Sequence, residues 1–290
     1  MGRTKVPFNF CGLPKEYSDM RTAKIVVLPM PFDGTSTWGK GADKGPAAII
    51  EASRNMELYD IETDSEVFTN GIATGRPLKC RSVNEMVAKS EREVGALLKQ
   101  GKFVVCLGGE HSVSIGPIRA HAKHYGEISV LHLDAHSDRR DKYEGSRYNH
   151  ACVIARASEC CKNIISVGIR SMDSSEIRRI DRKRIFFAHE IHGSNEWIRR
   201  AVDLLGNKVY VTIDLDVFDS GIMPSTGTPE PGGLGWYDVV GLLREVAMQR
   251  EIVGFDVVEL APNKNNRAPD FLAAKLAYTL LSYKFCRPPK

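Results

Sequence analysis

The chain has 290 residues, 42% of them hydrophobic, and a formal net charge of +4. This length can bury a large core as one α/β domain, the mild charge does not demand a nucleic acid, and no apolar run reaches transmembrane length. The chain starts without an apolar signal core, and its seven cysteines show no CxxC spacing. We therefore expect a cytoplasmic protein with reduced thiols and without a membrane or nucleic-acid partner.

Apolar stretches of strand character alternate with segments of helical periodicity. A polar stretch from Met1 to about Thr22 comes first, and we expect it to be an arm packed on one domain that spans residues 23–290. The expected strands are Ile25–Leu28, Phe103–Leu107, Ser129–Leu133, Ile164–Val167, Val209–Ile213 and Ile252–Val257. The expected helices are Glu85–Gln100, Ser112–His124, Ser174–Ile180, Glu196–Leu205, Tyr237–Gln249 and Pro269–Lys284. This alternation predicts a three-layer α/β/α fold, with helices on both faces of a parallel sheet.

Two acidic runs stand at the carboxyl ends of predicted strands, where open α/β sheets hold ligands. Within each run the acids occupy alternate positions, which face the same way in an extended chain. Together with a histidine that follows another strand, the runs offer six metal-ligand side chains: His111, Asp134, His136, Asp138, Asp214 and Asp216. Any one of these aspartates alone is also compatible with a helix cap or a turn.

The four carboxylates of this set would repel one another, and no lysine or arginine in the runs is placed to neutralise all of them. Two divalent cations would remove this conflict. Oxygen-rich ligands with only two imidazoles suit Mn²⁺ or Mg²⁺ better than a metal that selects thiolates. The sequence therefore predicts a dinuclear metal site.

Five motifs around these runs resemble one family closely. They are Gly108–Ser112, Asp134–Asp138, His150–Cys152, Asp214–Asp219 and Gly254–Glu259, and they follow the family's order between about Lys24 and Tyr283. The chain resembles the ureohydrolases, meaning arginase, agmatinase and their relatives, with the agmatinase branch nearest. This resemblance implies an arginase-like fold with eight strands in the sheet, and two Mn²⁺ per chain.

The resemblance also implies how the ligands are shared. One Mn²⁺ would be held by His111, Asp134, Asp138 and Asp214, and the other by Asp134, His136, Asp214 and Asp216. Asp134 and Asp214 would then bridge the two ions. A solvent oxygen between the ions would supply hydroxide near neutral pH, and Asp138 would hydrogen-bond that hydroxide.

Two further residues complete the expected catalytic set. Glu259 ends the last predicted strand and resembles the family's guanidinium-binding carboxylate, which can accept the guanidinium fork through two hydrogen bonds. His150 lies twelve residues after Asp138, at the family's proton-shuttle position, although it reads Asn149-His150-Ala151 where arginases carry His-Gly. We expect His150 to protonate the leaving amine, and a surface histidine in a loop is the alternative.

The loop from Arg139 to Asn149 bears on the substrate. The resemblance implies that arginases hold a substrate α-carboxylate there with Asn and Ser, a pattern this loop lacks. The loop offers Asp141 and Glu144 instead, which could bind a distal ammonium group or belong to a solvated charged loop. We expect agmatine as the substrate, giving putrescine and urea. The alternatives are N(1)-aminopropylagmatine, arginine or another guanidino acid. The family also suggests a homo-oligomer, either a trimer or a hexamer.

Rival functions fit the sequence less well. A zinc deacetylase of related fold would use one metal and a tandem histidine pair, which this chain lacks. A basic binding module would use Arg178, Arg179, Arg182, Lys183 and Arg184, but no aromatic residues are interleaved with them. The segment Gly34 to Lys40 fits GxxxxGK, yet Gly41 stands where a phosphate-binding loop needs Ser or Thr. His121 and His124 fit a solvated helix face.

Overall fold

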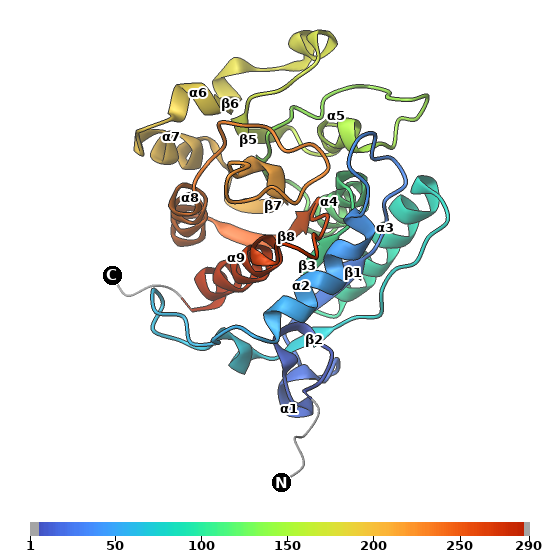
Figure 1. Cartoon of the computed structure of the whole chain (residues 1–290), viewed down its shortest axis with the longest axis vertical. Coiled ribbons are helices and arrows are strands. Elements are labelled where there is room, and N and C mark those ends of the chain that lie inside the picture. The colour runs from blue at the N-terminus through green and yellow to red at the C-terminus, as the bar shows by residue number, and fades with distance from the viewer. Residues whose placement is uncertain (1–5, 287–290) are drawn as a thin grey trace.

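The computed structural model describes residues 6–286, which contain one parallel sheet of eight strands (Figure 1). The strands are β1 (Ile25–Met30), β2 (Ile72–Thr74), β3 (Phe103–Gly108), β4 (Ser129–Leu133), β5 (Asn163–Ile169), β6 (Ile185–Phe187), β7 (Lys208–Asp214) and β8 (Glu251–Val258). All six strands located from the sequence are confirmed. β2 and β6 have three residues each, too few for a periodic pattern to reveal them.

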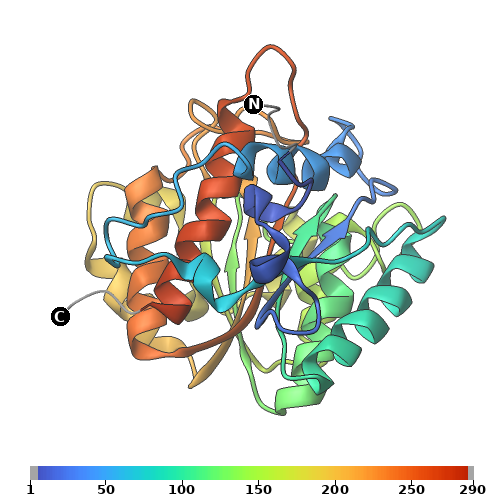
Figure 2. The ribbon, with the colours of Figure 1, turned by 90° about the horizontal axis from the view of Figure 1, so that it is seen from below.

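Helices cover both faces of the sheet, which confirms the three-layer α/β/α prediction (Figure 2). Their bounds are α1 (Lys15–Ser18), α2 (Gly45–Ser53), α3 (Val83–Lys99), α4 (Ile115–Tyr125), α5 (Val153–Ala157), α6 (Ala188–Ile191), α7 (Glu196–Leu204), α8 (Trp236–Gln249) and α9 (Ala268–Phe285). The helices α2, α7, α8 and α9 pack on one face, and α3, α4 and α5 on the other. Because both faces are covered, β1, β3 and β4 are buried along their whole length.

The order of the strands explains how the residues of the predicted metal site come together. Across the sheet the order is β2-β1-β3-β8-β7-β4-β5-β6, so β3, β8, β7 and β4 are consecutive neighbours. Their registers align Leu107 with Val257 and Asp214 with Val258. The chain segments that leave these four strands at their carboxyl ends therefore start close together.

The described part of the N-terminal arm packs on the sheet and on α2. The backbone N–H of Phe10 donates to Thr74 Oγ1 at 2.9 Å, and that of Cys11 donates to Ser53 Oγ at 2.8 Å. Residues 1–5 of the predicted arm and 287–290 of the predicted domain lie outside the described residues. The boundary at residue 23 stays a prediction.

Among residues 6–286, no helix is long and apolar enough to cross a bilayer.

The prediction of a solvated helix face is confirmed for His124 but wrong for His121, which is fully buried. The centres of the His121 and Tyr210 rings lie 4.6 Å apart, and His121 Nδ1 forms a hydrogen bond with the Pro117 carbonyl at 2.8 Å. The physical reason is that the His121 side chain faces the sheet, where its ring packs on Tyr210 of β7 and lies beside Gly254 of β8.

Candidate metal centre

Three of the four consecutive strands, β3, β7 and β4, deliver the six predicted ligands to one place. Glu110 and His111 follow β3, the run Asp134–Asp138 follows β4, and Asp214 ends β7. All six side chains line one cavity or lie directly beneath it, and Asp134 has no exposed surface. The carboxyl edge of the sheet thus carries the cluster, as the sequence predicted.

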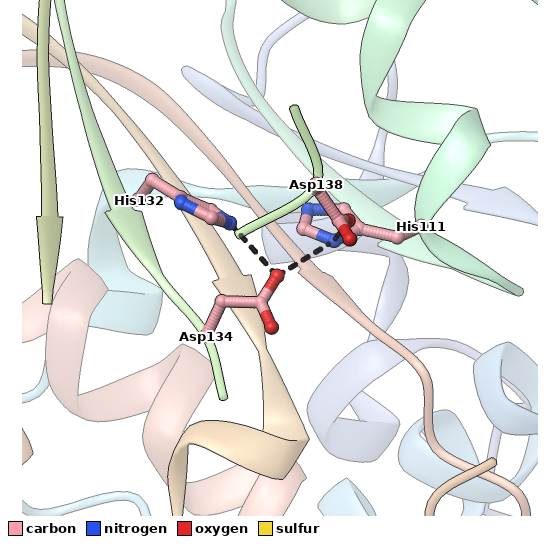
Figure 3. A group of neighbouring side chains, drawn as sticks. All are labelled: His111, His132, Asp134 and Asp138. Carbon is pink, nitrogen blue, oxygen red and sulfur yellow. Dashed lines mark hydrogen bonds and ion pairs between the residues drawn. The ribbon is translucent and has the colours of Figure 1, made fainter. Parts of the chain in front are cut away.

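The first half of the cluster surrounds one nitrogen of His111 (Figure 3). His111 Nδ1 lies 3.2 Å from Asp134 Oδ2, 3.1 Å from Asp138 Oδ2 and 3.4 Å from Asp214 Oδ2. This nitrogen is buried, and no described group forms a hydrogen bond with it. The ring nitrogen faces three carboxylate oxygens but has no hydrogen-bond geometry with any of them. A cation shared by these four atoms would satisfy all of them.

The second half of the cluster shares Asp134 with the first. His136 Nδ1 lies 2.8 Å from Asp216 Oδ2 and 3.6 Å from Asp134 Oδ1. Asp134 therefore turns one carboxylate oxygen toward each half. The two halves present a ligand set for two divalent cations, with Asp134 placed to bridge them.

The charges of this cluster are unbalanced. Burial and the neighbouring Asp216 and Asp134 raise the pKa of Asp214 well above its ordinary value, and burial and Asp134 raise the pKa of Asp138 to about 7. Burial opposes protonation of His136, but Asp216 and Asp134 raise its pKa to about 12. The side chains thus hold protons that divalent cations would displace.

A second layer of side chains orients these ligands. His132 Nε2 lies 2.8 Å from Asp134 Oδ2, while His132 Nδ1 lies 3.1 Å from Ser166 Oγ. On the other side, His111 Nε2 lies 3.0 Å from Thr212 Oγ1, which donates to Asp256 at 2.7 Å. Contacts of this kind fix the ring orientation of a metal-binding histidine.

We did not predict His132, Thr212 or Asp256 from the sequence. The alternation of side chains along a strand could have revealed two of them. His132 lies two residues before Asp134, and Thr212 lies two residues before Asp214, so each shares a face with a predicted ligand.

Glu259 and His150 both reach the cavity wall. Glu259 directly follows β8 in a left-handed conformation, with φ of +69°, and its Oε1 accepts a hydrogen bond from the backbone N–H of His111 at 2.6 Å. Burial and the nearby Glu110 raise its pKa well above the ordinary value. Asp138 also has a positive φ, of +52°, so two non-glycine residues with strained backbone lie at this site.

His150 begins a short 3-10 helix, His150–Cys152, in front of α5. Burial and the nearby His111 lower its pKa to about 4, and contact with the Thr35 carbonyl opposes this shift. The Tyr143 ring meets the imidazole edge-on, with the ring centres 5.8 Å apart. His150 is therefore a packed residue of the cavity wall.

The structure does not bring Asp141 or Glu144 into the cavity wall. Asp141 Oδ1 lies 2.8 Å from Arg156 and 3.6 Å from Arg147, outside the cavity. Glu144 lies in a turn closed by two backbone hydrogen bonds between Tyr143 and Ser146. Both residues therefore belong to a charged surface loop, the alternative that the sequence analysis left open.

Two other acids, Asp173 and Glu176, line the cavity in their place. Glu176 accepts hydrogen bonds from the backbone N–H groups of Arg139 at 2.5 Å and Asp173 at 2.7 Å. Asp173 caps the 3-10 helix Ser174–Arg179 through Oδ1, and its Oδ2 lies 3.5 Å from Arg140. The spacing Asp173-Ser-Ser-Glu176 is a capping box, which is the sequence signal that would have located this turn.

The cavity that these groups enclose has a volume of about 260 Å³. Its floor carries the ligand cluster, and Glu259 and His150 stand on its wall. Among the described residues that line it, Arg140 is the only lysine or arginine. Because acidic side chains outnumber this single arginine, the cavity suits a small cationic molecule.

Comparison with known proteins agrees with this site. The model of the arginase family matches residues 23–282. The N(1)-aminopropylagmatine ureohydrolase of Synechocystis is 37% identical over 96% of both chains, and that of a Thermus thermophilus strain is 39% identical over 90% of both. The agmatinase of Pyrococcus horikoshii is 32% identical over 91% of this chain and 93% of its own.

Two solved structures show the same fold. Agmatine ureohydrolase of Thermoplasma volcanium superposes with a TM-score of 0.83 at 34% identity, covering 91% of this chain and 90% of its own. Proclavaminate amidino hydrolase of Streptomyces clavuligerus gives a TM-score of 0.88 at 30% identity, covering 98% of both chains.

Proposed function

The chain belongs to the arginase family and is a ureohydrolase, and we propose that its substrate is N(1)-aminopropylagmatine. Hydrolysis of that guanidino group would release urea and spermidine. The observation that carries the proposal is that two relatives of this name are 37% and 39% identical over at least 90% of both chains. This replaces agmatine as our first expectation. Agmatine is the second candidate, supported by the agmatinase of P. horikoshii at 32% identity.

The charge of the cavity wall supports a substrate with a cationic tail. Of the acids that line the cavity, Asp173 has the most exposed side chain, at 40%, whereas Glu259 and Asp138 are buried. We infer that Asp173 faces the distal amines of the substrate, and that Glu259 receives its guanidinium. Arg140 is the one lysine or arginine among the described residues that line the cavity, and its cation already lies over the Tyr143 ring and near Asp173. An α-carboxylate would find little to bind here.

The two halves of the cluster offer ligands for two Mn²⁺, and Asp214 Oδ2 lies 3.4 Å from His111 Nδ1 beside them. We propose that these side chains share the ions as the sequence analysis expected. When bound, the ions supply Lewis acidity and bring the pKa of a water molecule close to neutral. Glu259 holds the guanidinium carbon in front of the cluster, and Asp138 accepts a hydrogen bond from the attacking oxygen. His150 passes a proton from solvent to the amine as it leaves, because its lowered pKa leaves the resting ring neutral and a free alkylamine is a strong base.

Urea release from a panel of guanidino compounds, assayed with Mn²⁺, tests this proposal. We expect N(1)-aminopropylagmatine to give the highest kcat/KM, agmatine the next, and arginine a value at least about a hundredfold below agmatine. Equal kcat/KM for arginine and agmatine would make the protein an arginase. A clear preference for agmatine would establish the second candidate instead.

Two properties of the whole enzyme also belong to the proposal. We propose a cytoplasmic enzyme that assembles as a homotrimer or homohexamer, as the family resemblance suggests. Light scattering on the purified protein would measure the assembly directly, and a monomeric mass would contradict it.

A further inference from the structure

The loop after β1 lies against the proposed proton donor. It contains Gly34 to Lys40, the segment that resembles a phosphate-binding loop but lacks its Ser or Thr. Thr35 in this loop is 115 positions from His150 in sequence, yet its Oγ1 lies 3.2 Å from His150 Nδ1. The same oxygen accepts a hydrogen bond from the backbone N–H of His150 at 3.0 Å. One hydroxyl thus holds both the ring and the main chain of His150.

The two lone pairs of this hydroxyl are enough for both contacts. A threonine hydroxyl has one proton and two lone pairs. One lone pair accepts the hydrogen bond from the backbone N–H of His150, which leaves the other lone pair for the ring nitrogen Nδ1.

This geometry determines which nitrogen of His150 carries a proton. A lone pair on Thr35 Oγ1 can bond Nδ1 only if Nδ1 is an N–H donor. The backbone carbonyl of Thr35, which also contacts the His150 ring, can only accept. Among the described residues none hydrogen-bonds Nε2, so Nε2 is the ring nitrogen available to the cavity.

We propose that Thr35 is a positioning residue that keeps Nδ1 of His150 protonated and leaves Nε2 to exchange the catalytic proton. This rests on the proposed ureohydrolase reaction. As the C–N bond to the leaving amine breaks, its electron pair stays on the amine nitrogen, which takes the proton from Nε2. His150 is left neutral with Nδ1–H still bonded to Thr35, and it regains its proton from solvent.

Two substitutions at position 35 separate the hydroxyl from the shape of the side chain. Thr35→Val keeps the branched shape and removes the hydroxyl, and Thr35→Ser keeps the hydroxyl. Thr69→Val is the control, because Thr69 is exposed and lies near the amino end of β2, at the opposite edge of the sheet from the cavity. Each is made in the wild-type chain, and Thr35→Val is also combined with His150→Ala.

We expect Thr35→Val to lower kcat by about tenfold to a hundredfold, with KM and metal content within about twofold of wild type. Thr35→Ser should restore most of the rate, and Thr69→Val should behave as wild type. In the His150→Ala background, Thr35→Val should cost almost nothing more, because its effect passes through the missing ring.

The inference is overturned if Thr35→Val keeps full kcat, if it changes KM or metal content instead, or if it slows the His150→Ala enzyme by the same factor as wild type. The proposed function fails in a different way, when the wild-type enzyme releases urea from none of the guanidino compounds. The two failures are therefore distinguishable.

Discussion

Two groups of carboxylates have opposite electrostatic surroundings. The cavity group, Asp134, Asp138, Asp214 and Asp216, faces histidines. The loop group consists of Asp141 and Glu159, and it faces four arginines: Arg119, Arg147, Arg156 and Arg179. Burial raises the pKa of Asp214 well above its usual value, whereas a hydrogen bond from Arg156 lowers that of Asp141.

The difference shows how an acidic cluster is to be interpreted. Carboxylates already matched by arginines are neutralised within the chain. They tie the loop from Arg139 to Asn149 to α5 and, through the pairs of Glu159 with Arg147 and Arg119, to α4. Carboxylates buried without such partners need cations from outside the chain. The following predictions test this contrast, from the largest expected effect to the smallest.

Chelation should abolish urea release, and added Mn²⁺ should restore it. The cavity group then loses the charges that balance it, so the temperature of unfolding should also fall on chelation and rise again with Mn²⁺. Urea assays and thermal unfolding on the same samples measure both effects. Full turnover in a sample shown to be free of metal would contradict the claim that the cavity group needs cations from outside the chain.

Asp214→Asn should lower kcat/KM by at least about a hundredfold. The amide keeps an oxygen that can accept the hydrogen bond now given by the N–H of Asp216 to Asp214 Oδ1 at 2.9 Å, so the local fold is preserved while the charge is lost. Steady-state kinetics and circular dichroism measure rate and fold. A folded variant with wild-type kinetics would show that Asp214 is not a metal ligand.

A buried histidine outside both groups gives a pH prediction. Burial lowers the pKa of His121 from 6.5 to about 4, so the unfolded chain binds a proton at pH values where the folded chain does not. Stability is therefore present at neutral pH and is lost as the pH falls from about 6.5 to about 4, by up to about 3 kcal/mol from this residue.

Denaturant unfolding of wild type and His121→Phe at pH 7 and pH 4.5 isolates this contribution. The variant should lose less stability between the two pH values than wild type does. An identical loss in both proteins would mean that His121 does not titrate as its burial requires.

Asp141→Asn should have the smallest effect, less than about tenfold on kcat/KM, with unchanged metal content. Arg156 and Arg147 retain Glu159 as a partner in this variant, so the loop keeps most of its ties. The substrate panel measured on this variant is the check. A large rise in KM confined to substrates with a distal amine would return Asp141 to the substrate-binding role that we first expected.

The sequence revealed the cavity group because its pattern is local. Alternation along an extended chain is enough to aim Asp134 and Asp138 together, and buried parallel strands end at one edge. The structure brings all six predicted ligands together, and their binding of metal stays a prediction. The family resemblance supplied the count of eight strands, which the short β2 and β6 would not have given alone.

The sequence did not reveal contacts between segments far apart in the chain. The partners of Asp141 come from its own loop and from α5, and Arg179 lies near it as well. The hydrogen bonds between Thr35 and His150 join loops 115 positions apart, and His121 is buried against Tyr210 of β7. None of these contacts leaves a periodic signal, since each depends on how whole elements pack.

The most direct test of the central claim is the number of metal ions bound per chain in the purified enzyme. Elemental analysis after loading with Mn²⁺ should saturate at two ions for wild type, because Asp134 offers one oxygen to each half of the cluster. Asp216→Ala removes a ligand of the second half only, so its metal content should fall toward one. Saturation of wild type at a single ion, with no change in Asp216→Ala, would contradict the dinuclear site.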